Sequence, residues 1–430
     1  MSNRINFYLT SNFGGGGQTV SRLFSYLSVL DGLKNSNIHL LLNYRYLDYL
    51  AIKPIFNAIE LNYLKSKPIS LNNYISYVGN KLAVGNGEIS SQFSYQKENF
   101  IPDIFLDSGM GSILSFWINN KSYPINQVVS ESIALIDDQL DFVKKHQPKY
   151  FVGLDYCKKN TYKKKETQQA NYNSIIDQLI HNSIHQNNLL EITIQKIQLN
   201  QNTSNREFDM GNIGLVAPIH GETITDYIHH YKSLLTIESR NNYKFAGFAL
   251  GGLAKFKASS IGKIVKEMRS LGEKRFIHIL GSSGIKKLPI LTLAGADSFD
   301  CHSPWRRAHD GEAKILIPLL DKNLNFSGQS LNTFSFCEIS KLTTKNYQCN
   351  CPICSSYSIT QIKNLYNNRA NSMEDYYFSS ILIYFHALYQ YHYLQIKLES
   401  LKTFSDYMAF FQSIPNTKLS NLLIKDAQLL

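Results

Sequence analysis

The sequence predicts an α/β protein built on a (β/α)8 TIM-like barrel, with a smaller cysteine-bearing subdomain toward the C-terminus. Short apolar runs rich in β-branched residues recur along the chain, and helical patterns lie between several of them. Continuous apolar runs are expected of parallel strands that are covered on both faces. Strand–helix–strand units repeated about eight times favour a closed barrel, with a doubly wound open sheet as the alternative.

Eight runs are expected to form the strands. They are INFYL from Ile5, IHLLLNY from Ile38, DIFLDSG from Asp103, YFVGLDYC from Tyr150, IGLVAPIHG from Ile213, FAGFALGGLA from Phe245, RFIHILGSSG from Arg275 and ILTLAGADSFDC from Ile290. Helical periodicity predicts helices at 174–189, 224–235 and 260–271, over most of 372–413, and at the C-terminal end. Residues 120–148 and 315–345 carry less pattern and are expected to be loops or insertions.

Acidic, histidine and glycine residues stand at the ends of these runs. They are Asp107, Asp155, His220, Gly251 with Gly252, Gly281 and Asp300. Barrel enzymes assemble their sites at the carboxyl ends of the strands. One aspartate at a strand end more often caps the following helix, but several converging on one rim indicate a functional site.

Composition narrows the classes of protein. Hydrophobic residues make up 43% of the 430-residue chain, which excludes a disordered protein. No window reaches the apolar length of a membrane span, and the first residues lack a signal peptide's apolar segment, so we expect a cytoplasmic protein without membrane contact. A formal net charge of +11 favours a nucleic-acid partner, although an Asn/Lys/Ile-rich composition accounts for it equally well.

Three cysteines, Cys349, Cys351 and Cys354, form a C-x-C-x-x-C motif. This spacing can aim three thiolates at one tetrahedral zinc ion, with His386 as the fourth ligand and His392 as its competitor. Four protein ligands would close the coordination shell, so the zinc is expected to be structural. The expected domains are a barrel at 1–340, a zinc-binding subdomain at 341–395 and a helical tail at 396–430.

Four blocks in this order resemble the tRNA-guanine transglycosylase (queuine tRNA-ribosyltransferase) superfamily, over roughly residues 100 to 390. They are LDSGMGS from Leu106, ALGGLA from Ala249, FDCHSPWRRAHDG from Phe299, and the cysteine triplet followed by His386 and Leu388. The resemblance implies exchange of a guanine base in a nucleic acid through a covalent glycosyl-enzyme, with the target nucleotide flipped into the site.

The resemblance also implies roles for individual residues. Asp300 would be the nucleophile, selected over Asp297 by the family's F-D-C register, and Asp107 the general acid/base. The base-binding residues would be Ser108, Asp155, Gly251, Gly252, Leu253 and Leu280. Arg306 and His309 would contact the nucleic acid.

The chain departs from the family pattern at several positions. Trp305 and His309 replace a threonine and the second arginine of the segment that reads the anticodon in bacterial tRNA enzymes. The family's V-Q-G block reads VAPIHG from Val216, which places Ala217 at the glutamine and leaves His220 as a substitute. Lys257 replaces a glutamate that favours a cationic aminomethyl base, and this favours 7-cyano-7-deazaguanine as the incoming base.

These departures favour DNA over tRNA as the polymer, with a queuosine-type tRNA enzyme as the alternative. A non-catalytic, zinc-containing nucleic-acid-binding protein is the alternative from another class, and a metal-dependent barrel hydrolase is a third. Retention of both Asp107 and Asp300 disfavours the non-catalytic protein. The expected partners are DNA or tRNA, a 7-deazaguanine base, and a second copy of the chain or other modification proteins.

Overall fold

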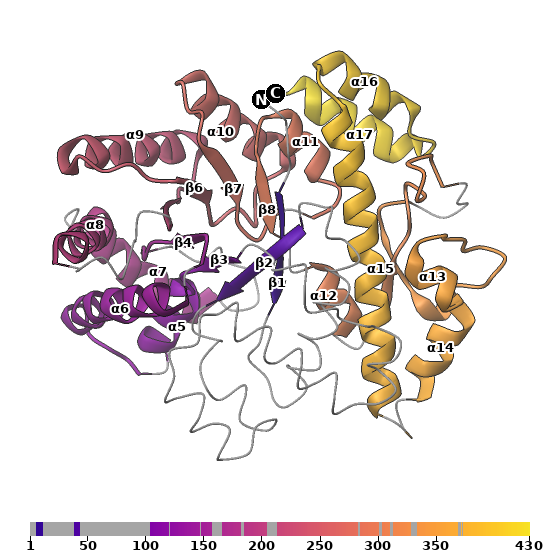
Figure 1. Cartoon of the computed structure of the whole chain (residues 1–430), viewed down its shortest axis with the longest axis horizontal. Helices are drawn as coiled ribbons and strands as arrows, with labels where there is room; N and C mark the ends of the chain where they lie inside the picture. Colours follow the sequence, from indigo (N-terminus) through magenta and orange to yellow (C-terminus); the bar gives the residue numbers. More distant parts are fainter. Residues whose placement is uncertain are drawn as a thin grey trace.

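The computed structural model describes residues 6–11, 38–43, 104–119, 121–146, 148–156, 166–181, 185–203, 213–282, 284–300, 303–309, 313–327, 333–368, 371 and 373–430. Eight parallel strands close a barrel at the centre of the molecule (Figure 1). The strands are β1 (Asn6–Ser11), β2 (Ile38–Asn43), β3 (Ile104–Asp107), β4 (Tyr150–Val152), β5 (Gly214–Ile219), β6 (Gly247–Leu250), β7 (Phe276–Ile279) and β8 (Ser298–Asp300).

The barrel closes in sequence order. Each strand pairs in parallel with the next, and β8 returns to pair with β1, where Phe299 lies opposite Phe7. This closure confirms the predicted (β/α)8 fold, and the open-sheet alternative is wrong. Because all strands are parallel, their carboxyl ends meet at the same rim of the barrel.

Helices surround the barrel between successive strands. They are α5 (Met110–Asn119), α6 (Ile125–His146), α7 (Glu166–His181), α8 (His185–Thr203), α9 (Ile224–Asn241), α10 (Ala258–Ser270), α11 (Leu288–Leu293) and α12 (Ser303–His309). The helix predicted at 224–235 begins at the residue where α9 begins, because Thr223 and Asp226 form a reciprocal capping box there.

The prediction of loops at 120–148 is wrong, since α6 fills most of that segment. The apolar stripe of α6 is interrupted by Ser132 and Gln139, which are both fully buried. Ser132 donates to the carbonyl of Val128, and the Gln139 amide donates to the carbonyl of Val152 in β4 at 2.9 Å. Polar residues on the buried face therefore concealed the helical period.

Two other boundaries differ from the prediction. The helix expected at 174–189 is divided between α7 and α8. The last apolar run is a helix before it is a strand, because Pro289 lies in the first turn of the short α11 and only Ser298–Asp300 extend as β8. Part of the segment expected as a loop at 315–345 forms a strand pair, described next.

The C-terminal part forms a second layer of structure beside α12. It contains an antiparallel pair, β9 (Lys314–Leu316) and β10 (Phe336–Glu338), the 3-10 turn η4 (Ile339–Lys341), and helices α13 (Pro352–Ser356), α14 (Ile359–Asn367), α15 (Met373–Ser400), α16 (Phe404–Ser413) and α17 (Thr417–Gln428). The long α15 packs against α12, α14 and β9, while α16 and α17 return to α10 and α11 (Figure 1). The predicted domain boundaries stay a prediction, and α15 runs across the one at 395.

Two apolar layers hold the barrel together. Phe105, Val152, Val216 and Ala249 fill its interior, and a larger cluster packs the outer faces of the strands against the helices. The interior residues come from four neighbouring strands and are each at most 1% exposed. They form an apolar plug below the carboxyl rim. None of the helices that the structure describes is long and apolar enough to cross a membrane.

Candidate functional site

The carboxyl rim of the barrel carries the side chains that the sequence singled out. Side chains alternate along a strand, so the inward set that includes Phe105, Val216 and Ala249 continues two or four residues later. At the rim this inward set ends in Asp107, His220, Gly251, Leu280 and Asp300. The strand period therefore places two carboxylates, an imidazole and a glycine directly above the apolar plug.

Asp300, the predicted nucleophile, is the last residue of β8 and is buried. Its Oδ1 accepts a hydrogen bond of 2.6 Å from the backbone N–H of Gly281, which follows β7. Gly281 has a φ of +63°, a left-handed conformation that favours glycine and turns this N–H toward the carboxylate. Nε2 of His278 lies 3.2 Å from the same oxygen. The carboxylate is thus held by the neighbouring strand.

Asp107, the predicted general acid/base, ends β3 and is partly buried. Burial raises the pKa of Asp107 to about 7, and the negative charges of Asp300 and Asp155 add to the increase. Hydrogen bonds from the backbone of Gly109 and Ser108 act in the opposite direction. A carboxyl group whose pKa lies near neutral can both give and take a proton at physiological pH, as acid–base catalysis requires.

Asp155, the predicted base reader, follows β4, and its carboxylate forms an ion pair with Nε2 of His220. Burial lowers the pKa of His220, but the charges of Asp155 and Asp107 and the hydrogen bond to Asp155 outweigh it and raise that pKa. Ala217, which the family pattern aligned with the glutamine, is fully buried in the middle of β5. Of these two residues, His220 lies at the rim, whereas Ala217 lies within the strand below it.

Two consecutive glycines at the end of β6 border this ion pair. A Cβ on Gly251 would lie 2.1 Å from the His220 ring, so a larger residue would displace the imidazole. Gly252 adopts a φ of +71°. The hydroxyl of Tyr227 donates to the carbonyl of Gly251 at 2.5 Å and fixes the turn. The glycines thus keep the backbone close to His220 and Asp155.

The other predicted base-binding residues lie around the same rim. Leu253 and Ser108 are buried, and Leu280 is half-buried at the edge of the interior cluster. Ser108 caps the start of α5 by accepting from the N–H of Met110 at 3.4 Å. The structure thus places all six predicted base-binding residues at the carboxyl end of β3, β4, β6 or β7.

Asp297, the rival for the nucleophile, lies at the opposite end of β8. Its carboxylate pairs with Arg269 and accepts the N–H of Ile277 at 2.8 Å. Arg269, on α10, also donates to the carbonyl of Gly295, so it links α10 to the segment that precedes β8. Asp297 therefore has a structural environment away from the rim.

The predicted nucleic-acid contacts are placed only in part. Arg306 and His309 lie in α12, directly after β8, but their side chains fall outside the described residues, as does that of Trp305. Cys301 lies outside the described residues, as does the lysine-rich run KKNTYKKK from Lys158, a candidate for lining a nucleic-acid groove. The roles of Arg306 and His309 stay predictions.

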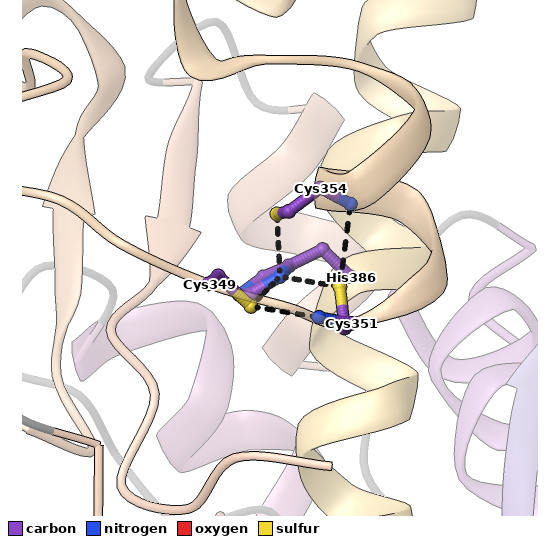
Figure 2. Close-up of side chains that lie close together, drawn as sticks. All are labelled: Cys349, Cys351, Cys354 and His386. Carbon is purple, nitrogen blue, oxygen red and sulfur yellow. Dashed lines mark hydrogen bonds between the residues drawn. The ribbon is translucent and has the colours of Figure 1, made fainter.

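Three sulfurs and one imidazole converge beside α15 (Figure 2). The ligand atoms of Cys349, Cys351, Cys354 and His386 all lie within 4.8 Å of one another, so the group could hold a metal ion. Sulfur-to-Nδ1 distances are 3.7 Å for Cys349 and 3.4 Å for both Cys351 and Cys354. Zinc bonded tetrahedrally at about 2.3 Å to sulfur and about 2.0 Å to nitrogen separates them by about 3.5 Å. The group has the dimensions of a zinc site.

His386 is oriented for metal binding by its other nitrogen. Nε2 donates to the carbonyl of Leu316 in β9 at 2.7 Å, which leaves the lone pair of Nδ1 facing the sulfurs. The backbone N–H groups of Cys351 and Cys354 lie 3.5 and 3.4 Å from the preceding sulfurs, where they stabilise thiolates. His392 lies six residues further along α15 and is not in the cluster, which decides the fourth ligand between the two histidines.

Replacing Cys351 by alanine is expected to lower bound zinc from about one ion per chain to nearly none. Metal-binding free energy contributes to folding, so the melting temperature should also fall, by roughly 10 °C. Elemental analysis of purified protein measures the zinc. The matched control is Cys337→Ala, because Cys337 is a half-buried cysteine outside the cluster. Equal zinc contents in Cys351→Ala and wild type would contradict the site.

His278 was not recognised from the sequence as part of the site. A histidine inside an apolar strand is usually a core residue, and the run RFIHIL carries no other signal. Alternation along β7 could have revealed it, since Phe276, His278 and Leu280 share one face of the strand. In the structure this face points into the barrel, next to Asp300.

Comparison with known proteins identifies the family. The family model of queuine tRNA-ribosyltransferase matches residues 52–397, which is most of the chain. A search of curated protein sequences finds no match. Enzymes of the matched family exchange guanine bases in nucleic acids and bind zinc, in agreement with the rim carboxylates and the Cys3His cluster. The chain belongs to the queuine tRNA-ribosyltransferase family of guanine transglycosylases.

Proposed function

We propose that this protein exchanges a guanine base in a nucleic acid for a 7-deazaguanine, with Asp300 as nucleophile and Asp107 as general acid/base. The observation that carries the proposal is the pair of rim carboxylates in contrasting environments. Asp300 is held by hydrogen-bond donors, and Asp107 is partly buried near other carboxylates with a pKa of about 7. One group suits attack as an anion and the other suits proton transfer.

The reaction balances with these two side chains alone. Asp300 attacks the anomeric carbon C1′, the bond from C1′ to guanine breaks, and the departing base takes the proton of Asp107. The incoming base then returns a proton to Asp107 and bonds to C1′, while the electrons of the ester bond return to the Asp300 carboxylate. A carboxylate suits this two-step displacement because it can stabilise the oxocarbenium-like transition state and then leave.

Asp155 and His220 would recognise the base through hydrogen bonds. The Asp155 carboxylate would accept hydrogen bonds from the guanine edge, where a 7-deazaguanine presents the same donors. His220 pairs with Asp155 and lies on Gly251, so its imidazole is the natural donor to the base oxygen. The target nucleotide has to be flipped out of its stack to reach C1′.

We favour DNA as the polymer and 7-cyano-7-deazaguanine as the incoming base. Trp305 and His309 differ from the residues that read the anticodon in bacterial tRNA enzymes. Lys257 is exposed between β6 and α10, on the loop that follows Gly251 and Gly252. Its positive charge would repel a cationic aminomethyl group and tolerate a neutral nitrile. The Cys3His cluster would hold a structural zinc ion.

Incubation of the protein with labelled guanine and either duplex DNA or bulk tRNA tests the function. We expect label to enter DNA, and excess 7-cyano-7-deazaguanine to displace it more effectively than the aminomethyl analogue. Incorporation only into tRNA would replace the DNA assignment with the tRNA enzyme. No incorporation into either polymer, by protein that binds both, would favour the non-catalytic binding protein.

A further inference from the structure

His278 and Ser298 are buried polar residues inside the barrel that the roles assigned above do not use. His278 is fully buried on β7, and Ser298 opens β8 as its partner in the register of the two strands. Polar groups buried away from water are normally retained only with hydrogen-bond partners. His278 and Ser298 are hydrogen-bond partners of each other, and His278 also contacts Asp300.

Three side chains form a line of hydrogen bonds that ends on Asp300. Nε2 of His278 lies 3.2 Å from Oδ1 of Asp300, and Nδ1 lies 2.5 Å from the hydroxyl oxygen of Ser298. An ionised carboxylate has no proton to donate, so Nε2 carries the hydrogen and Nδ1 accepts from Ser298. The edge-to-face contact with the Phe105 ring, 4.6 Å between centroids, holds the plane of the imidazole.

We propose that His278, fixed in one tautomer by Ser298, is a positioning residue that favours release of the sugar from Asp300. The inference rests on the function proposed above. His278 and the N–H of Gly281 both donate to Oδ1, so two donors converge on one carboxylate oxygen. These donors fix the orientation of the carboxylate before any substrate arrives.

The same donors act differently on the two states of Asp300. In the free enzyme the side chain is an anion, whereas in the glycosyl-enzyme it is an ester with a neutral carbonyl oxygen. Hydrogen bonds to an ionised acceptor are about twice as strong as those to a neutral one. His278 therefore stabilises the free carboxylate more than the ester.

Because His278 stabilises the carboxylate more than the ester, it favours the second half of the reaction, in which the ester is cleaved. There the incoming base bonds to C1′, the bond from C1′ to the Asp300 oxygen breaks, and its electron pair returns to the carboxylate. A donor already aimed at the oxygen where charge develops lowers the barrier to that step. Without His278 the covalent adduct should persist.

Replacing His278 by leucine tests this role. With nucleic acid and no incoming base, we expect a larger fraction of the protein to remain as covalent adduct on a denaturing gel. Reversal of the adduct should need roughly tenfold more guanine, and kcat should fall by roughly tenfold with little change in KM for the base. A purely structural role would lower adduct formation and turnover together.

Two further variants make the test independent of folding. His278→Gln keeps an amide donor facing Asp300 and should restore most of kcat, while Ser298→Ala removes only the partner that fixes the tautomer and should cost a few-fold. The melting temperature of each variant reports folding. Wild-type adduct levels in His278→Leu, or parallel loss in the leucine and glutamine variants, would overturn the inference. A wild-type protein that exchanges no guanine would instead defeat the proposed function.

Discussion

Asp300→Asn protein is expected to show no guanine exchange above background and to form no covalent adduct with nucleic acid. Asparagine preserves the shape of the side chain and can accept the hydrogen bonds of Gly281 and His278, but a neutral amide cannot form the glycosyl ester. Loss of a nucleophile of this kind costs at least about a thousandfold in rate. Exchange of labelled guanine and a denaturing gel measure the two effects.

The matched control is Asp297→Asn, three residues earlier in the chain and immediately before β8. Asp297 pairs with Arg269 at the far end of β8, so its loss should lower stability slightly and leave exchange intact. A covalent adduct in the Asp300→Asn protein would rule out this nucleophile. Loss of exchange in both variants, each with the thermal stability of wild type, would contradict the choice of Asp300 over Asp297 as nucleophile.

The second large effect is expected from Asp107→Asn, which should lower exchange by roughly a hundredfold or more because proton transfer to and from the bases is lost. The same substitution should stabilise the fold at neutral and alkaline pH. Burial and the charges of Asp300 and Asp155 raise the pKa of Asp107 from 3.8 to about 7. Ionising this group in the folded state therefore costs free energy that asparagine avoids.

The stability of wild type relative to the variant should depend on pH, because the pKa of Asp107 is 3.8 in the unfolded chain and about 7 in the folded protein. Below about pH 4 the carboxyl group is protonated in both states, and the variant and wild type should be equally stable. Between about pH 4 and pH 7 the unfolded chain releases the proton while the folded protein keeps it, so wild type loses stability relative to the variant. Above pH 7 the difference should level off at roughly 2–4 kcal/mol.

Chemical denaturation at pH 5, 6 and 8 measures this difference in the free energy of unfolding. Asp300→Asn serves as the comparison. It keeps the Asp107 carboxyl group but removes one of the charges that raise its pKa. A difference between Asp107→Asn and wild type that is constant from pH 5 to pH 8 would contradict the raised pKa.

The sequence could predict those features that depend on local patterns. Apolar runs that end in an acid placed Asp107 and Asp300 at the rim, because strand period and parallel direction suffice for that inference. The capping residues Thr223 and Asp226 are likewise close in the chain, three positions apart, and they cap the start of α9. Local rules decide which end of a strand a residue occupies.

Contacts between separate strands could not be predicted in the same way. The pairing of Asp155 with His220 and of His278 with Asp300 depends on strand register and barrel closure, which the pattern of single runs does not contain. His386 was expected as the fourth ligand, but its hydrogen bond to the carbonyl of Leu316, seventy positions away in sequence, could not be foreseen. Long-range geometry supplied these partners.

The apolar plug inside the barrel bears on hydrolysis. A glycosyl ester on Asp300 could be cleaved by water as well as by a base, and water would produce an abasic site instead of a modified one. Phe105, Val152, Val216 and Ala249 pack together beneath the rim, so on the side of the barrel formed by β3 to β6 apolar side chains oppose the approach of water from below. A bound base would fill the mouth of the barrel. The apolar interior would then help to protect the integrity of the polymer.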